Sequence, residues 1–298
     1  MVSFIKKYTL LVAMVVGILG YKWFSVLIPY TPIFIFLILL LTFSKLSFNN
    51  LKPSLLHLWL LLIQIIGSIV IFYAIVPFNS ILAQGAMICV LCPTATAAAV
   101  VTGKLGGKIE TVASYTLFIN ITVAVVAPLL FPLMNGGETV AFGTLSFKIL
   151  VKIVPLLIFP FLIIIIINKF FPKTNEKIKS CSGTAFYIWA FCLIIAISQV
   201  TKAFVIEVIE KKHGGVTVVL LVVCSLILCC LQFLFGKTIG SKYNDRIAGG
   251  QALGQKNTIL AIWLISQCHF TPLAAIGAGT YIVWQNIINS WQLNRKKN

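Results

Sequence analysis

The chain has 298 residues, of which 60% are hydrophobic and only 10% are charged. Ordinary soluble domains carry about 25% charged residues, so this composition excludes that class and indicates an integral membrane protein. The net charge of +17 does not indicate nucleic-acid binding, because the basic residues fall between apolar runs rather than on one soluble face.

Apolar runs punctuated by Gly, Pro and Lys predict an all-α membrane protein of about ten spans. Several runs approach or reach the ~20 helical residues that cross a ~30 Å hydrocarbon core. The predicted spans are 7–24, 28–46, 52–76, 80–104, 108–134, 146–170, 180–201, 215–237, 244–268 and 271–293.

The first 24 residues have the basic start and apolar centre of a signal peptide. No small-residue cleavage pattern follows them, so we expect this segment to stay in the chain as the first span.

The charged loops predict the orientation in the cell membrane. Sixteen basic residues fall in one set of alternate loops: Lys6, Lys7, Lys45, Lys52, Lys104, Lys108, Lys169, Lys173, Lys177, Lys179, Lys237, Lys242, Arg246, Arg295, Lys296 and Lys297. Six fall in the other set: Lys22, Lys148, Lys152, Lys202, Lys211 and Lys212. Cytoplasmic loops carry the excess of Lys and Arg, so both termini are expected in the cytoplasm.

Ten spans with both termini on one side allow two halves of five, and an odd number of spans per half makes the halves inverted. Small and polar residues interrupt the fourth span at LCPTATAAAVVTGKLGG (91–107) and the ninth at IAGGQALGQKNTILA (247–261), which occupy corresponding places in the two halves. Broken helices expose backbone ends that bind ions and polar groups near mid-membrane. The pattern therefore favours a transporter.

Polar residues also mark the spans that follow each interruption. Asn120 and Thr122 lie in the fifth span, and Gln285 and Asn286 lie in the tenth. Each taken alone is explained by hydrogen bonds between packed helices, worth ~0.6 kcal/mol on average. Their clustering with the interruptions favours a binding site for the group.

At these residues the chain resembles the bile acid:sodium symporter family. The stretch LCPTATAAAVVTGKLGG is similar to the family's fourth-helix pattern, and GQKNTILA (254–261) is similar to the end of its ninth-helix pattern of Glu, any residue, Gly, any residue, Gln, Asn. The similarity continues through APLLFPLM (127–134) and AAIGAGTYIVWQNI (274–287).

The resemblance implies ten helices in two inverted five-helix repeats, with broken helices 4 and 9 crossing each other. It implies a panel domain from residues 1–50 (spans 1 and 2) and 141–205 (spans 6 and 7). A core domain would comprise residues 51–140 (spans 3 to 5) and 206–298 (spans 8 to 10). Substrates in the family are organic anions, movement of the core against the panel gives alternating access, and sodium usually drives uptake.

The fourth-helix match departs from the family at one point. Pro93 and Thr96 fit the pattern, but Ala98 and Ala99 replace the polar pair that should follow them. In the third span Gln64 lies about where the family has a sodium-linked Gln, without the neighbouring Met-Pro.

The ninth-helix match departs further. Aligning Gly254 and Asn257 without gaps places Ala252 at the family's Glu and Lys256 at its Gln. A shift by one residue instead places Gln251 at the Glu and Gln255 at the Gln. The carboxylate is missing in either alignment.

All six acidic residues are predicted near loops or helix ends: Glu110, Glu138, Glu176, Glu207, Glu210 and Asp245. A hard cation taken out of water needs several oxygens, usually including an anionic one, so this distribution argues against the family's usual sodium sites.

Lys256 is the remaining charged candidate inside the membrane. An ammonium at the centre of a spanning helix costs ~2.5–3.5 kcal/mol, so we expect it to face a cavity and find acceptors. We hypothesise that it replaces the ion, that broken-helix carbonyls accept its three donors, and that it attracts an anionic substrate. Loss of its proton would allow proton coupling. The alternative is that the side chain snorkels to an aqueous edge.

The candidate substrate- or ion-binding residues are Gln64, Thr94, Thr96, Asn120, Thr122, Gln251, Gln255, Lys256, Asn257, Gln285 and Asn286. They predict a secondary transporter of a small organic anion that works by alternating access and is independent of sodium. Two alternatives stay open: a sodium-coupled symporter with backbone and Gln ligands, and an efflux carrier of the same architecture. An enzyme is disfavoured, because the three histidines are far apart in sequence and lack an intramembrane acid as partner.

The expected partners are the small organic anion and the lipid bilayer. Neither nucleic acid nor an obligate protein partner is expected, and no cofactor is expected apart from the open case of Na⁺. The eight cysteines, with Cys89 and Cys92 among them, lie mostly in apolar stretches. There a thiol behaves as a small hydrophobe, and no His or Cys cluster has zinc spacing.

Overall fold

The chain is helical throughout the part that the structure describes. The computed structural model describes residues 2–45, 51–134, 142–210, 214–268 and 270–297, and it has no β-strand within these ranges. Six helical stretches there are long and apolar enough to cross a membrane: Tyr21–Phe43, Leu55–Ile75, Ile109–Met134, Phe142–Phe170, Pro172–Glu210 and Gly215–Lys242. The chain is therefore a multi-pass membrane protein of the all-α class.

The elements divide between the two halves of the chain. The first half holds α1 (Val2–Leu19), α2 (Tyr21–Phe24), the 3₁₀-helix η1 (Ser25–Tyr30), α3 (Thr31–Phe43), α4 (Leu55–Ile75), α5 (Ser80–Leu91), α6 (Ala98–Leu105) and α7 (Ile109–Met134). The second half holds α8 (Phe142–Phe170), α9 (Pro172–Ser180), η3 (Cys181–Thr184), α10 (Ala185–Phe204), the π-helix η4 (Val205–Glu210), α11 (Gly215–Lys242), α12 (Arg246–Gly254), α13 (Thr258–Gln267), η5 (Pro272–Ala274) and α14 (Ala275–Lys297).

The predicted spans overlap these elements, but several of the predicted gaps contain helix. Residues 172–179 and 202–210, predicted outside the spans, belong to the continuous helical stretch Pro172–Glu210. Residues 25–27, predicted as a gap between two spans, are helical, because α2, η1 and α3 follow one another directly. A proline in the first turn of α3 is compatible with this continuity, since the first-turn N–H groups have no partner within the helix. Ten crossings remain a prediction, because α1, α14 and the two pairs of short helices are not among the six stretches above.

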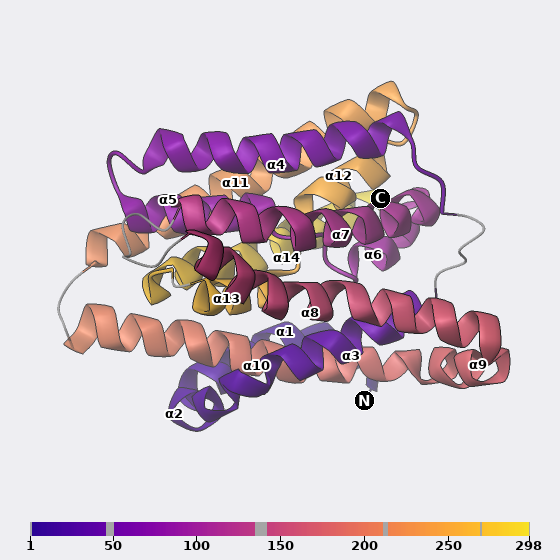
Figure 1. Cartoon of the computed structure of the whole chain (residues 1–298), viewed down its shortest axis with the longest axis horizontal. Helices are drawn as coiled ribbons and strands as arrows, with labels where there is room; N and C mark the ends of the chain where they lie inside the picture. The colour runs from indigo at the N-terminus through magenta and orange to yellow at the C-terminus, as the bar shows by residue number, and fades with distance from the viewer. Residues whose placement is uncertain (1, 46–50, 135–141, 211–213, 269, 298) are drawn as a thin grey trace.

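Two groups of helices pack side by side. In one group α1 lies along α10, and α3 packs on both α8 and α10. In the other group α4 packs on α5, and α11 packs on α12 and α14. Figure 1 shows α1, α2, α3 and α10 together at the lower side of the view, with α4, α5, α11 and α12 at the upper side. The division of these groups into a panel and a core domain stays a prediction.

The closest helix contact joins α11 and α12 through glycine. A Cβ built on Gly236 would meet the carbonyl of Gly249, and a Cβ on Gly249 would meet the carbonyl of Gly236 and the backbone of Gly240. Small residues let helix backbones approach closely where lipid supplies no hydrophobic drive between helices. These glycines fix the position of α12, the helix that leads into the second predicted interruption.

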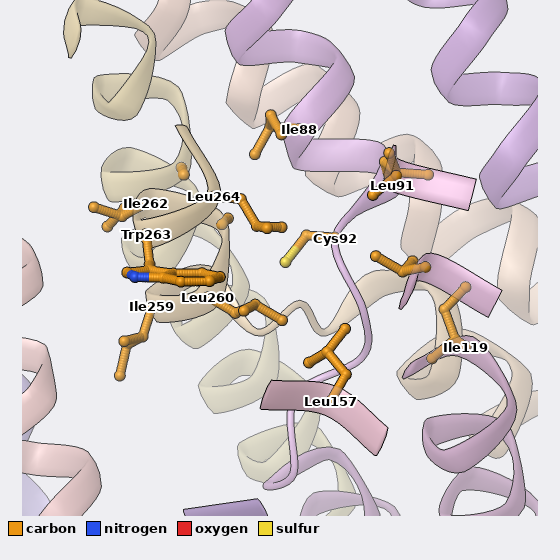
Figure 2. Packing of buried hydrophobic residues seen from close by; sticks show 14 of the residues in the cluster. Ile88, Leu91, Cys92, Ile119, Leu157, Ile259, Leu260, Ile262, Trp263 and Leu264 are labelled. Carbon is orange, nitrogen blue, oxygen red and sulfur yellow. The ribbon is translucent and has the colours of Figure 1, made fainter. Parts of the chain in front are cut away.

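Apolar side chains from four helices surround the region where α5 and α12 end. Figure 2 shows the labelled members of this cluster, which come from α5, α7, α8 and α13: Ile88, Leu91, Cys92, Ile119, Leu157, Ile259, Leu260, Ile262, Trp263 and Leu264. All of them are buried. The ends of the interrupted helices therefore lie in an apolar surrounding, where each polar backbone group needs a partner inside the protein.

Candidate functional site

The two predicted interruptions are real breaks, and they touch each other. Helix α5 ends at Leu91 and α6 begins at Ala98, while α12 ends at Gly254 and α13 begins at Thr258. Pro93 lacks an N–H, and the preceding Cys92 adopts the extended backbone (ψ 137°) that a residue before proline favours.

A short antiparallel bridge joins the breaks at Thr94 and Lys256. The amide of Ala95 donates to the carbonyl of Gln255 at 2.9 Å, and the amide of Asn257 donates to the carbonyl of Pro93 at 2.8 Å. The Thr94 hydroxyl also donates to the carbonyl of Ala252 in the last turn of α12. The chain thus builds one crossing from residues about 160 positions apart.

Gln64 on α4 satisfies the carbonyls at the end of α5. Its Nε2 donates to the carbonyl of Leu91 at 2.9 Å and to that of Cys92 at 2.8 Å. The hydroxyl of Tyr115 on α7 donates to Gln64 Oε1 at 2.8 Å. Both side chains of this contact, Gln64 and Tyr115, are buried.

A second Gln and Tyr lie at the end of α12. The hydroxyl of Tyr281 on α14 donates to the carbonyl of Gly254 at 2.8 Å. Gln232 on α11 donates from Nε2 to the Tyr281 hydroxyl at 3.0 Å and to the carbonyl of Cys89 at 3.3 Å. The ends of both interrupted helices are therefore held by a buried Gln–Tyr pair from the long helices beside them.

Lys256 is held firmly through its backbone and is buried. Its amide donates to Gln285 Oε1 at 2.8 Å, and its carbonyl accepts from Gln285 Nε2 at 3.2 Å. The residue is 1% exposed, and its Nζ has no hydrogen-bond partner among the described residues. The side chain does not snorkel to the surface of the structure.

The surroundings of Lys256 differ from the expected arrangement. The broken-helix carbonyls do not accept from Nζ in this structure. They accept instead from the backbone and from Gln64, Tyr281 and Gln285. A buried ammonium is thereby left with hydrogen-bonding capacity for a further group.

The other predicted residues divide into those at the crossing and those that bond elsewhere. At the crossing, Asn257 Oδ1 caps α13 by accepting from the amide of Leu260 at 3.3 Å, and Gln255 is buried with its Oε1 unpaired among the described residues. Thr96 is half-buried in the turn before α6.

Four predicted residues bond away from the crossing. Gln251 donates to Asn289 on α14 at 2.9 Å. Asn120, Thr122 and Asn286 each donate to a carbonyl of their own helix, at 2.6, 2.8 and 2.7 Å. Only the Gln251–Asn289 contact joins two helices, and the buried Gln251 Oε1 and Asn120 Oδ1 have no partner among the described residues, so the role of these four residues stays a prediction.

The residues at the crossing lack the carboxylate that a sodium site usually includes, although the buried amide oxygens of Gln251 and Gln255 have no partner among the described residues. A hard cation needs several free oxygens, usually with a carboxylate among them. Here the carbonyls of the two breaks accept hydrogen bonds, the segment 246–258 contains no acid, and the ammonium of Lys256 lies at the same place. Elsewhere in the described residues, no group of three or more His, Cys, Asp or Glu side chains has a geometry suited to a metal ion.

Comparisons with known proteins identify the family. Residues 9–288 match the SBF-like CPA transporter family. No curated protein matches the chain. The match spans both interruptions and agrees with the resemblance to bile acid:sodium symporters. The chain belongs to the SBF-like CPA transporter family.

Proposed function

We propose that the chain carries a small organic anion across the cell membrane by alternating access, with Lys256 as the residue that binds the anion. Family membership makes it a secondary transporter rather than an enzyme. The observation that carries the proposal is the Lys256 side chain, which is 1% exposed and lacks a hydrogen-bond partner among the described residues. The anionic group of a substrate supplies the acceptors that the ammonium lacks.

The free-energy argument favours an anion over a neutral ligand. An unpaired charge in a low-dielectric region is costly, and a hydrogen bond to an ionised group contributes about 1.5–3 kcal/mol. One buried cation, with no acidic residue in the adjoining segment 246–258, matches a ligand with one negative charge. The buried Trp263 and Ile259 of α13 lie two turns or less beyond Lys256 and favour a ligand with an apolar body.

We further propose ten crossings in two inverted repeats, with α5/α6 and α12/α13 as the broken helices. The order of elements supports the repeats. A long helix with a buried Gln precedes each break (Gln64 and Gln232), and a long helix with a buried Tyr follows it (Tyr115 and Tyr281). The distribution of basic residues between alternate loops supports an even number of crossings with both termini in the cytoplasm.

Transport by the purified protein in liposomes tests the proposal. Uptake of radiolabelled monocarboxylates and sulfonates is measured with KCl or choline chloride in place of NaCl. The wild type is expected to take up at least one of these anions without sodium. The Lys256→Gln variant is expected to lose about tenfold or more of its uptake efficiency, as the loss of one charge-assisted hydrogen bond predicts.

Lys152→Gln is the matched control, because Lys152 is exposed on α8 and its removal deletes the same charge. It should leave uptake unchanged. Equal kinetics of the wild type and Lys256→Gln would exclude Lys256 as the binding residue. Uptake by the wild type only in sodium would show that an ion, rather than the lysine, supplies the positive charge.

A pH series on the same liposomes identifies the coupling. If Lys256 exchanges a proton during transport, an imposed pH gradient drives accumulation of the anion in the wild type. Uptake that only equilibrates the anion, with no response to the gradient, indicates a facilitator.

A further inference from the structure

Most carbonyl oxygens of the two breaks accept hydrogen bonds from within the protein. In the first break, those of Leu91 and Cys92 accept from Gln64, and that of Pro93 accepts from the amide of Asn257. Every carbonyl from residue 91 to 93 therefore has a donor.

The second break is satisfied in the same way. The carbonyl of Gly254 accepts from Tyr281, and that of Gln255 accepts from the amide of Ala95. The carbonyl of Lys256 accepts from Gln285, and that of Asn257 accepts from the thiol of Cys92 at 2.9 Å and from a backbone amide. Every carbonyl from residue 254 to 257 therefore has a donor as well.

Each carbonyl oxygen at the end of a broken helix needs a partner. The last four carbonyls of a helix accept no hydrogen bond within that helix, and in an apolar surrounding each unsatisfied group costs several kcal/mol. A cation can supply the missing attraction, and so can an N–H or O–H donor. A carbonyl oxygen has two lone pairs, so a donor on one of them leaves at most one for a cation.

We infer that the two Gln–Tyr pairs, Gln64–Tyr115 and Gln232–Tyr281, take the place of a coupling cation at the crossing, so that the broken helices are held without sodium. Tyr115, Gln232 and Tyr281 are then positioning residues. Tyr281 donates to the break directly, and Gln232 donates to Tyr281. Tyr115 fixes the amide of Gln64 so that its Nε2 faces the two carbonyls of α5.

Burial supports the assignment of these pairs. Gln64, Tyr115 and Tyr281 are each 0% exposed, and Gln232 is 5% exposed. Each pair joins the long helix before its break to the long helix after it, α4 to α7 and α11 to α14. In the first pair the Gln donates to the break, and in the second pair the Tyr does. The inference stands whether or not the chain carries an organic anion.

Thermal unfolding of the purified protein in detergent tests the inference independently of transport. Tyr115→Phe and Tyr281→Phe each delete one hydroxyl and keep the ring. Each is expected to lower Tm by about 2 °C or more, since a buried group loses its partner. Tyr73→Phe is the matched control, because Tyr73 is 53% exposed on α4, and it should leave Tm unchanged.

A sodium titration separates replacement of the ion from a merely structural contribution. Tm of the wild type is measured in NaCl, KCl and choline chloride at equal ionic strength, and the three values are expected to coincide. Lys256→Gln should also show no sodium-specific rise, because its break carbonyls keep their donors after the charge is removed.

Three results would overturn the inference. One is a rise of Tm with NaCl, but not with KCl, in the wild type. Another is the same sodium-specific rise of Tm in Lys256→Gln. That rise would show that the Gln–Tyr pairs do not exclude the ion, and it would leave the anion-binding proposal intact. The third is a Tm for Tyr115→Phe and Tyr281→Phe equal to that of Tyr73→Phe.

Discussion

The two broken helices are built on the same plan, but the second is fixed much more tightly. Both helices are buried over the turns that lead into their breaks, residues 83–91 in α5 and 248–254 in α12, so the difference lies in the glycine contacts. In α12 the contact of Gly249 is with the backbone of α11. In α5, a Cβ on Gly85 would meet mainly the end of the Leu221 side chain.

The breaks themselves differ in the same direction. The second break spans three residues, ends in the Asn257 cap and is held by Gln285. The first break spans residues 92–97, and α6 begins after it without a side-chain cap. The first break interrupts its helix without placing a charged residue at the crossing. The second break holds Lys256, the charged residue of the crossing, in a fixed position.

The largest expected effect comes from the glycine contact. Gly249→Ala should lower the free energy of unfolding by about 3 kcal/mol, at the upper end of overpacking costs, because neither backbone can move away. Gly85→Ala should cost less, since a flexible Leu side chain can adjust.

Thermal unfolding and the yield of folded protein measure both changes. Gly143→Ala on α8 is the control, because a Cβ there meets nothing within 4 Å. If Gly85→Ala lowers the free energy of unfolding as much as Gly249→Ala does, α5 and α12 are fixed equally tightly.

Removing the Gln285 side chain should have the second largest effect. Gln285→Leu keeps the approximate volume but deletes both bonds to the Lys256 backbone, leaving a buried amide and carbonyl with fewer partners. We expect a loss of about 2 kcal/mol in the free energy of unfolding and weaker substrate binding.

The control is Asn286→Ala, because Asn286 donates to its own helix at Ile282. Binding is followed by the ligand-induced shift of Tm. If Gln285→Leu lowers stability but leaves this shift unchanged, the fixed backbone of Lys256 is not needed to present the ammonium.

The smallest expected effect concerns the cap of α13. Asn257→Ala deletes the Oδ1 acceptor for Leu260 and should cost about 1 kcal/mol, the usual value for an N-cap. Asn257→Ser keeps a capping oxygen and should recover most of the loss, as chemical denaturation in mixed micelles can measure. Equal losses for Ala and Ser would show that the cap does not stabilise the second break.

The sequence was sufficient to locate the two breaks and to identify Lys256 as the charged residue between them. Interruptions by Pro93 and Gly254 stand out against apolar runs, and a lysine inside such a run has few structural explanations. The family resemblance rested on the same residues, and the family match confirms it.

The partners of the breaks were largely missed. Gln64 was selected, but Tyr115, Gln232 and Tyr281 were not. A tyrosine in an apolar helix is ordinarily explained by packing, and its hydroxyl partner depends on a tertiary contact that no local pattern encodes. Gln232 is a polar residue within the long apolar run of α11 and was the one available signal. The expectation that carbonyls would accept from Lys256 failed for the same reason, because their other donors come from distant helices.

The backbone bridge between Thr94 and Lys256 has a mechanical consequence. Two amide–carbonyl bonds in an apolar surrounding tie α5/α6 to α12/α13, so pulling one break apart from the other is costly. We therefore expect the two broken helices to move together as one rigid unit. Sliding is expected to be easier where α13 faces α10, since the contact there between described residues includes a long 3.3 Å hydrogen bond from the Gln199 side chain to the carbonyl of Ile262.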